Sequence, residues 1–298
     1  MRSRSFIVLL AIVALACGLF IVRAQEPEDD VRGAFISTRP KMTNNNAPAR
    51  RRRTRNANSS SATQKNANQA AANANHSGNL NSAVVHKLSE AIGLGYTLFM
   101  RDPNGRTVRA EPSREFHNGD SVRIALEPNV DGYLYVFHTE GNGAPEMIYP
   151  DWRLEGGENW IEAHVPIEVP SSTETDERLR WFTFYGNAGI ERLYVVVSRE
   201  PLPLVPTGDR LVTFCAANKD KCPWHPVSEL WSQIQNGIRA NVKVVEAKSF
   251  GQAQSEKEQI ATTRGLGLDQ TAPEPSVIRM SASTNAPLLV TVLDLIHK

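Results

Sequence analysis

The stretch Gly132-Tyr133-Leu134-Tyr135-Val136-Phe137-His138 is a run of aromatic and β-branched residues that follows a turn at residues 128–131. Such a run, bounded by turn formers, is typical of a buried strand. Upstream, residues 121–127 alternate between apolar and more polar side chains, which is the period of a strand with one solvated face. We therefore expect these two segments to form a hairpin, with the later strands placed beside it.

Further segments of this kind follow at even spacing. They cover residues 95–100, 107–109, 147–150, 160–169, 181–185 and 192–197, with turn formers between them. Pro166 cannot donate to a strand ladder, so the segment that contains it is expected at a sheet edge. The pattern predicts a mainly β module over residues 83–204, an antiparallel β-sandwich that is either immunoglobulin-like or a partly open barrel.

Residues 205–298 are expected to form a small α/β extension of this module. The elements predicted there are a helix from Pro226 to Ile238, a strand over 242–245, a helix over 252–263 and a strand over 288–296. The final strand is too apolar to be a loose tail. We expect it to return to the sheet and complete it.

The first 24 residues resemble a secretory signal peptide. A basic start precedes an uncharged apolar run at 6–22, and the small residue Ala24 stands before Gln25. The chain is therefore expected outside the cytoplasm: periplasmic, secreted or associated with the cell envelope. An uncleaved membrane anchor remains the alternative, although the run is slightly shorter than the roughly 20 residues that span a bilayer.

Residues 25–82 are predicted to be a disordered tether. From residue 42 onward the segment is rich in Asn, Ala and Ser and has no aromatic residue, so it cannot bury enough surface to fold. It carries a basic patch made of Arg50, Arg51, Arg52, Arg53 and Arg55. Because the leader exports the chain, we expect this patch to contact anionic lipid or cell-wall polymer rather than nucleic acid. Residues 31–36 are interpreted either as an edge strand or as a docking peptide.

Two cysteines remain once the leader is set aside, Cys215 and Cys222. In an exported protein such a pair is expected to form a disulfide. A metal site that adds His225 is the alternative, but the gap between the cysteines is wider than the usual ligand spacing and no fourth ligand is evident.

No catalytic motif was found in the sequence, so we expect neither an enzyme nor a cofactor. His138 and His164 would suggest a hydrolytic site if they met near Asp151, although each is more simply a residue at a sheet margin. Asp131, Asp151 and Glu155 lie in turns and could bind calcium, but no contiguous ligand loop is present and no metal site is assigned.

Aromatic residues offer the clearest candidate for a binding surface. Tyr133 and Tyr135 share one strand face, and Trp160 and Trp181 are expected near it. Such a cluster forms either a platform for a sugar or peptide or part of the core. The platform requires that at least two of the rings be exposed together.

Several spaced motifs agree in order with one known family. They are Gly119-Asp120, Asp131-Gly132-Tyr133-Leu134-Tyr135-Val136, Ile148-Tyr149-Pro150, Val169-Pro170 and Glu191-Arg192-Leu193-Tyr194-Val195. Together they resemble the bacterial extracytoplasmic family catalogued as a domain of unknown function, DUF4384, over roughly residues 94–199. The resemblance implies a β-rich exported module, often fused to protease-like, kinase-like or envelope domains, and it supplies no catalytic residue.

These observations predict an exported, non-catalytic cell-envelope module that binds or scaffolds an envelope protein or glycan. Its net charge of +1 implies no polyanionic partner for the chain as a whole. Two alternatives remain: an envelope hydrolase with an unrecognised site, and polyanion binding through the arginine-rich tether. Contact with a membrane is expected only through an uncleaved leader or the basic patch.

Overall fold

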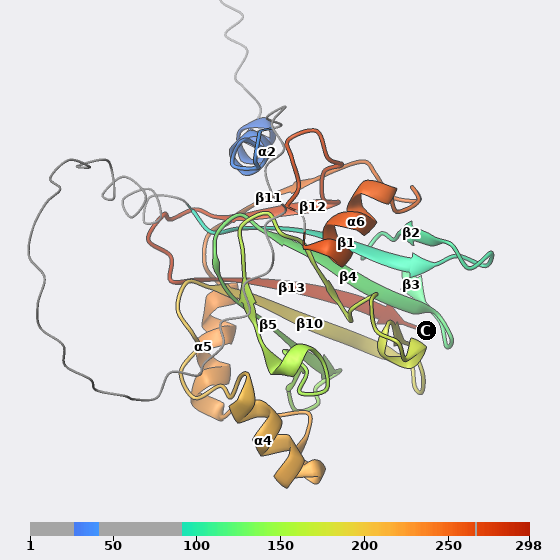
Figure 1. The fold of residues 1–298 in the computed structure, drawn as a ribbon, viewed down its shortest axis with the longest axis vertical. Helices are drawn as coiled ribbons and strands as arrows, with labels where there is room; N and C mark the ends of the chain where they lie inside the picture. Colours follow the sequence, from blue (N-terminus) through green and yellow to red (C-terminus); the bar gives the residue numbers. More distant parts are fainter. Residues whose placement is uncertain (1–26, 42–90, 266) are drawn as a thin grey trace, which may run out of the picture.

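The computed structural model describes residues 27–41, 91–265 and 267–298 (Figure 1). The predicted signal peptide, the arginine patch and the tether from residue 42 onward lie outside the described residues. Within the described part, thirteen strands form two sheets that face one another. No helix in this part is long and apolar enough to cross a membrane.

The first sheet has the strand order β11-β12-β1-β4-β8, with β2 beside β1 and β9 beside β4. Its strands are β1 (Gly93–Arg101), β2 (Thr107–Arg109), β4 (Ser121–Pro128), β8 (Ile167–Val169), β9 (Phe182–Thr183), β11 (Val242–Glu246) and β12 (Val277–Ser281). All of its pairings are antiparallel.

The second sheet has the order β3-β13-β10-β5-β6, with β7 beside β5. Its strands are β3 (Glu115–Phe116), β5 (Gly132–Glu140), β6 (Glu146–Tyr149), β7 (Trp160–Ile161), β10 (Gly189–Ser198) and β13 (Leu288–His297). The short pairing of β13 with β3 is parallel, and the others are antiparallel.

Alternate residues of the two sheets fill the space between them. Leu94 and Leu98 of β1 and Ile124 of β4 meet Leu134 of β5 and Val195 of β10, and each is at most 1% exposed. Side chains that point to one face of a strand recur every second residue, so this interior follows directly from the alternation in the sequence. The predicted mainly β sandwich is confirmed, and the sheets do not close into a barrel.

The predicted hairpin of β4 and β5 is wrong, because these strands belong to different sheets. The chain crosses between the sheets at residues 128–131. Asn129 holds the crossing: its side-chain oxygen accepts the Gly93 N–H at 2.6 Å, and its side-chain nitrogen donates to the Ala91 carbonyl at 3.0 Å. Since β4 is flanked by β1 and β8, and β5 by β10 and β6, neither strand has a free edge for the other.

The single strand predicted over residues 160–169 is also wrong. Its first part is β7 in the second sheet, and its last part is β8 at an edge of the first sheet. Between them the backbone N–H of His164 donates to the Pro128 carbonyl at 2.7 Å, which fastens this crossing to the earlier one. His164 has a positive φ of 57° and is 2% exposed, so it does not face solvent as the alternation suggested.

Residues 205–298 contribute to both sheets and do not form a separate extension. The predicted strands appear as β11 and β13, and β13 runs beside β10 over ten residue pairs, from Gly189↔His297 to Ser198↔Leu288. The predicted helices are α5 (Ser228–Ile238) and α6 (Glu256–Arg264), and α6 ends at the left-handed Gly265. The C-terminal strand β13 lies between β10 and β3, so it is an interior strand of the second sheet and completes that sheet as predicted.

Helices cover the outer faces of both sheets (Figure 1). α4 (Asp209–Ala217) and α5 lie over the second sheet, where Leu211, Leu230 and Ile234 pack against Tyr135 and Phe137. On the other side, α6 and an N-terminal helix, α2 (Pro27–Ser37), lie over the first sheet. Three short 3-10 turns complete the described elements: η2 (Glu155–Gly157), η3 (Glu177–Leu179) and η4 (Lys219–Lys221).

The disordered tether predicted over residues 25–82 is wrong for its first part, because residues 27–41 form α2 and an ordered continuation. The edge strand considered for residues 31–36 is wrong as well, because these residues belong to α2. Val31 and Phe35 are one helical turn apart, and both pack against Ile278 on the outer face of the first sheet.

Candidate functional site

Three hollows lie side by side along the loop between β6 and β7 and around β8. The middle hollow has a volume of about 200 Å³ and includes Tyr149, Glu168 and Trp181 in its wall. A second, of about 310 Å³, contains Trp160 and shares four lining residues with the first. The third, of about 230 Å³, contains Trp152 and also shares four lining residues with the first. We call this continuous surface the tryptophan groove.

Four of the five tryptophans of the chain line this groove: Trp152, Trp160, Trp181 and Trp224. Three of them are partly exposed, whereas Trp181 is 9% exposed. The fifth, Trp231, packs edge-on against Tyr194 and Phe137 under α5. Tryptophan carries a large apolar ring with one polar N–H, so partly exposed tryptophans gathered along one groove provide a surface for a ligand with apolar and polar faces.

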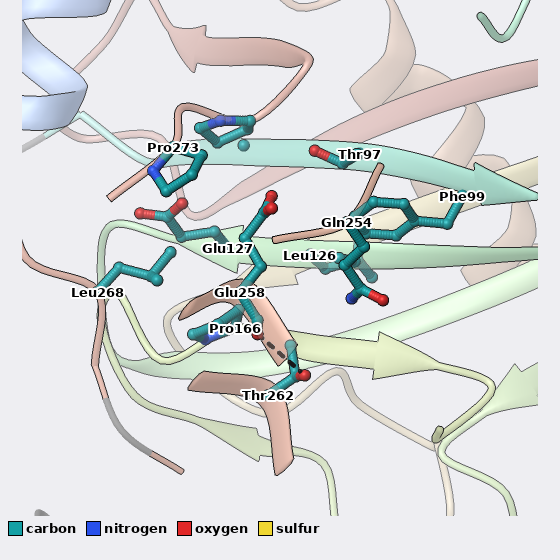
Figure 2. Close-up of a pocket in the computed structure, with 13 residues that line it drawn as sticks. Thr97, Phe99, Leu126, Glu127, Pro166, Gln254, Glu258, Thr262, Leu268 and Pro273 are labelled. Atoms are coloured by element: carbon teal, nitrogen blue, oxygen red, sulfur yellow. Dashed lines mark hydrogen bonds between the residues drawn. The ribbon is translucent and has the colours of Figure 1, made fainter. Parts of the chain in front are cut away.

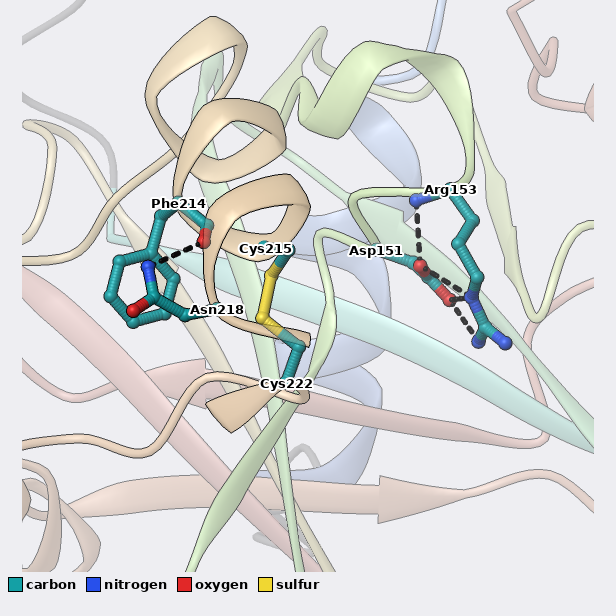
Figure 3. The surroundings of a disulfide bond; sticks show 6 residues. All are labelled: Asp151, Arg153, Phe214, Cys215, Asn218 and Cys222. Atoms are coloured by element: carbon teal, nitrogen blue, oxygen red, sulfur yellow. Dashed lines mark hydrogen bonds and ion pairs between the residues drawn. A yellow bond between two sulfur atoms is a disulfide. The ribbon is translucent and has the colours of Figure 1, made fainter. Parts of the chain in front are cut away.

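A tight turn holds Arg153 at the wall between the middle and third hollows. The Asp151 carboxylate accepts the Arg153 backbone N–H at 2.9 Å and its side-chain nitrogens at 2.6 and 3.0 Å (Figure 3). These hydrogen bonds raise the pKa of Arg153, so its charge is permanent. About half of the Arg153 side chain stays exposed, at 51%. The turn therefore presents a fixed cation together with its carboxylate.

The predicted disulfide between Cys215 and Cys222 is present, and it joins the end of α4 to the segment that carries Trp224 (Figure 3). The backbone of Trp224 also accepts the N–H of Met147 in β6 at 2.8 Å. His225 donates from Nδ1 to the Pro145 carbonyl at 2.8 Å. The cysteines are therefore bonded to each other rather than poised as metal ligands, and they fasten Trp224 to the groove.

The charged side chains beneath Trp181 are Arg123 and Glu168, which are buried, and Arg101, which is partly exposed. The guanidinium carbon of Arg123 lies 4.2 Å from the centre of the Trp181 ring, and that of Arg101 lies 5.1 Å away. Glu168 lies 3.7 Å from Arg123 and accepts a hydrogen bond from Gln254 at 2.7 Å. Burial lowers the pKa of Arg123, and Glu168 opposes this shift. Trp181 is therefore held rigidly as a wall of the groove and presents little surface itself.

The other predicted aromatic residues divide between groove margin and core. Tyr133 and Trp160 form an edge-to-face pair, with 5.1 Å between ring centres, and both are partly exposed. Tyr135 is fully buried under the helices, and its hydroxyl accepts the Leu202 N–H at 3.0 Å. The core-packing interpretation therefore describes Tyr135, while Tyr133 and Trp160 retain the exposure that binding requires.

His138 and His164 lie in different clusters and do not meet at Asp151. His138 lies between Glu146, at 3.2 Å, and Glu191, at 2.6 Å. Burial lowers the pKa of His138, but the hydrogen bonds to these two carboxylates outweigh it and raise the pKa. His164 instead contacts Glu127 at 2.8 Å beneath the N-terminal segment.

The hollow nearest to the Glu127 carboxylate has no room for a substrate. It lies between the first sheet and α6, is lined also by Glu258 and Leu268, and has a volume of about 30 Å³ (Figure 2). That volume holds about one or two water molecules. Among the described residues, no group of three His, Cys, Asp or Glu side chains is arranged to hold a metal ion. Asp131 and Asp151 are instead bonded to Ala163 N–H and to Arg153.

Sequence reasoning did not select Trp224, Arg153 or Glu168 as site residues. One available signal was that Trp224 follows Cys222 by two residues, so a disulfide would fix its position. Nothing in the sequence indicated that loops some 70 residues apart would line one groove, because that depends on the two crossings between the sheets.

The groove overlaps with the part of the chain that a family model matches. Tyr149, Glu168 and Trp181 all fall within the matched range, whereas β1 and β13, which lie inside their sheets, fall outside it. No curated protein and no solved structure matches the chain significantly. Residues 115–201 match the family described as "Domain of unknown function (DUF4384)", the family that the spaced motifs predicted.

Proposed function

We propose that this chain is an exported, non-catalytic module of the cell envelope that binds a glycan in the tryptophan groove. The observation that carries the proposal is the gathering of three partly exposed tryptophans, Trp152, Trp160 and Trp224, along adjoining hollows whose wall includes the buried Trp181. Indole rings supply flat apolar area with a polar N–H, which suits the apolar faces and hydroxyls of sugars.

The polar groups of the groove fit the same ligand. Asp151, Arg153, Glu155 and Glu162 lie among the rings, so donors and acceptors of both charges are available to sugar hydroxyls. The cationic groups Arg153 and Lys219 lie toward the third hollow. This distribution supports a neutral or mildly acidic glycan over a strongly charged polymer.

Export is the second part of the proposal. It rests on the leader-like residues 1–24 and on the Cys215–Cys222 disulfide, a bond that persists in oxidising compartments. Absence of a catalytic motif in the sequence supports binding over hydrolysis. The arginine patch at 50–55 supplies an additional, salt-sensitive contact with anionic polymer.

The test is binding of the purified full chain to isolated cell-wall polymer and to its soluble oligosaccharide fragments, measured by co-sedimentation and calorimetry. Trp160→Ala and Trp224→Ala are expected to weaken binding at least about tenfold each, since loss of one stacked ring costs about 1.4 kcal/mol or more. Tyr185→Ala is the matched control, because Tyr185 is 74% exposed and does not line the groove.

Three outcomes decide between the alternatives. Equal weakening by the tryptophan variants and the control would refute the groove. Binding that depends on salt and vanishes when residues 50–55 are changed would instead assign recognition to the arginine patch. Release of soluble products from the polymer would show hydrolysis and overturn the non-catalytic assignment.

A further inference from the structure

The N-terminal segment 27–41 sits on the first sheet through three side chains spaced four residues apart. Val31, Phe35 and Arg39 are 4%, 0% and 2% exposed. Val31 and Phe35 are one turn apart on the same face of α2, and Arg39 follows in the turn after the helix. We call the surface beneath them the seat.

Two glycines of β1 form the part of the seat that receives Phe35. A Cβ atom on Gly93 would lie 2.9 Å from the Phe35 ring, and one on Gly95 would lie 3.1 Å from it. The ring also lies edge-on to His164, with 5.3 Å between centres. Since larger residues at Gly93 or Gly95 would displace the ring, the seat is shaped for an aromatic side chain.

Arg39 enters the most polar part of the seat and finds a partner for each of its side-chain nitrogens. Its Nε and Nη2 donate to the two oxygens of Glu127, each at 2.7 Å. Nη1 donates to the Ala272 carbonyl at 3.0 Å, and Nη2 also donates to the Pro273 carbonyl at 3.2 Å. A bidentate pair of this kind selects arginine over lysine, because the planar fork matches the carboxylate.

Backbone recognition accompanies these side chains. Gln270 donates from its side chain to the carbonyls of Ser37 and Arg39, at 3.1 and 3.2 Å, and from its backbone to Pro40 at 3.2 Å. Thr38 lies 2.8 Å from His164. Shape, charge and backbone contacts thus act together, as they do in a peptide-binding site.

The segment 27–41 is bound on the surface of the first sheet and is not part of the core. It contributes no strand to either sheet, and its apolar contacts form a cluster distinct from the core between the sheets. Residues 42–90 separate it from β1 in the sequence. A chain of about 50 residues can span on the order of 160 Å, so its length does not restrict the segment to its own seat.

We propose that the seat is a peptide-binding site for the pattern Val-x-x-x-Phe-x-x-x-Arg, and that segment 27–41 of one copy of this chain can occupy the seat of another. Exchange of an identical element conserves every contact and is a low-cost route to association. The chain's own segment is tethered, so its effective concentration at the seat is high and it competes well against the segment of another copy. Exchange is therefore expected at high protein concentration, or when a substitution weakens the binding of the chain's own segment.

The first experiment measures exchange of the segment itself. A protease site placed in the full chain at residues 60–66 is cut after folding, and a fluorescent peptide of residues 27–41 is added while anisotropy is recorded. Saturable uptake is expected. Peptides with Arg39→Ala or Phe35→Ala should bind at least about 30-fold more weakly. Truncating one partner of a buried charged pair has effects of this size, and so does removal of a fully buried phenylalanine ring.

The matched control is the Lys41→Ala peptide, because Lys41 is exposed. Its affinity should equal that of the native peptide. Since the changes are made in the peptide, the body of the protein stays intact. Failure of the cut chain to take up the labelled peptide, or equal uptake of the Arg39→Ala peptide, overturns the proposal.

The second experiment tests occupancy by another copy. A full chain with Arg39→Ala has an intact seat and a segment that binds weakly. A full chain with Glu127→Gln has an intact segment and a seat that binds weakly. Each should run as a monomer in sedimentation velocity, and a mixture should form one-to-one pairs that excess 27–41 peptide dissolves. A mixture that stays monomeric at about 100 μM, near the low end of effective concentrations for tethered segments, overturns occupancy by a second copy.

Discussion

The guanidinium of Arg39 and the carboxylate of Glu127 form a two-point ion pair inside the protein, although 88 residues separate them in the sequence. The arginine side chain is 0% exposed and that of Glu127 is 5% exposed. Burial alone would raise the pKa of Glu127, but hydrogen bonds from His164 and Arg39 outweigh it and hold the pKa below its usual value. The pair therefore stays ionised where an isolated carboxylate would not.

Removing Arg39 should destabilise the protein strongly. Arg39→Met leaves the Glu127 carboxylate buried without its main partner, and loss of one partner of a buried pair costs about 3–5 kcal/mol. Urea unfolding at pH 7 measures the loss. Lys41→Ala, on the exposed side of the same segment, should stay within about 0.5 kcal/mol of the native chain. A small effect of Arg39→Met would show that the segment is not docked in solution.

His138 should make the stability of the protein depend on pH above about 6.5, the usual pKa of histidine. The pKa of His138 is raised in the folded state, so the ring holds its proton more tightly in the folded protein than in the unfolded chain. This stabilisation is complete below the unfolded pKa and is lost as pH rises through the folded pKa. Thermal unfolding between pH 5.5 and 8.5 should therefore show a falling melting temperature, and His138→Gln should flatten that part of the curve.

His117→Gln provides the control for this measurement, because His117 is exposed and lies in the turn before β4. Its profile should follow that of the native chain. An unchanged profile for His138→Gln would mean that the contacts to Glu146 and Glu191 do not hold the charged ring in solution.

Gly132 should not tolerate a side chain. A Cβ atom there would lie 2.3 Å from the backbone oxygen of Ser198 in the neighbouring strand. Backbone cannot move aside as a side chain would, so Gly132→Ala is expected to cost at least about 1–3 kcal/mol. Gly189→Ala, also in the second sheet, meets nothing within 4 Å and should be close to neutral in the same urea titration. Similar losses for the two variants would contradict the close approach.

The disulfide should stabilise the protein and order the third hollow of the groove. Replacing Cys215 and Cys222 together by serine is expected to cost about 2–3 kcal/mol, the magnitude for a short closed loop. Trp224 should also become more mobile, which time-resolved anisotropy of the indole would detect. Mass spectrometry of the non-reduced purified chain gives the control, since two free thiols there would remove the basis for the effect.

The local pattern of residue types along the sequence was sufficient to predict most strands and helices. The strands at 95–100 and 192–197 were predicted because runs of aromatic and β-branched residues between turn formers favour strands, whatever they pair with. The end of α6 at Gly265 was predicted because a left-handed residue there favours glycine. These elements depend on interactions within a few residues, which a single sequence displays directly.

The errors share one cause, which is that pairing partners are not local. The segments on either side of residues 128–131 look like a hairpin, and only the strand pairings of the folded chain show that it changes sheets there. The same applies to residues 160–169, where alternation continues across a crossing that is pinned by Pro128. Alternation cannot distinguish a continuous strand from two short strands in facing sheets.

The sequence by itself determined that the protein is mainly β, that its strands enclose a filled interior, and that roughly residues 94–199 resemble one family, whose model matches residues 115–201. Tertiary structure alone decided which residues meet: four tryptophans along one groove, and Arg39 against Glu127. The physical reason is that alternation of apolar residues records which side of a strand is buried. Contacts between residues far apart are set by how two complete sheets and their covering segments pack together, and no short stretch of sequence carries that information.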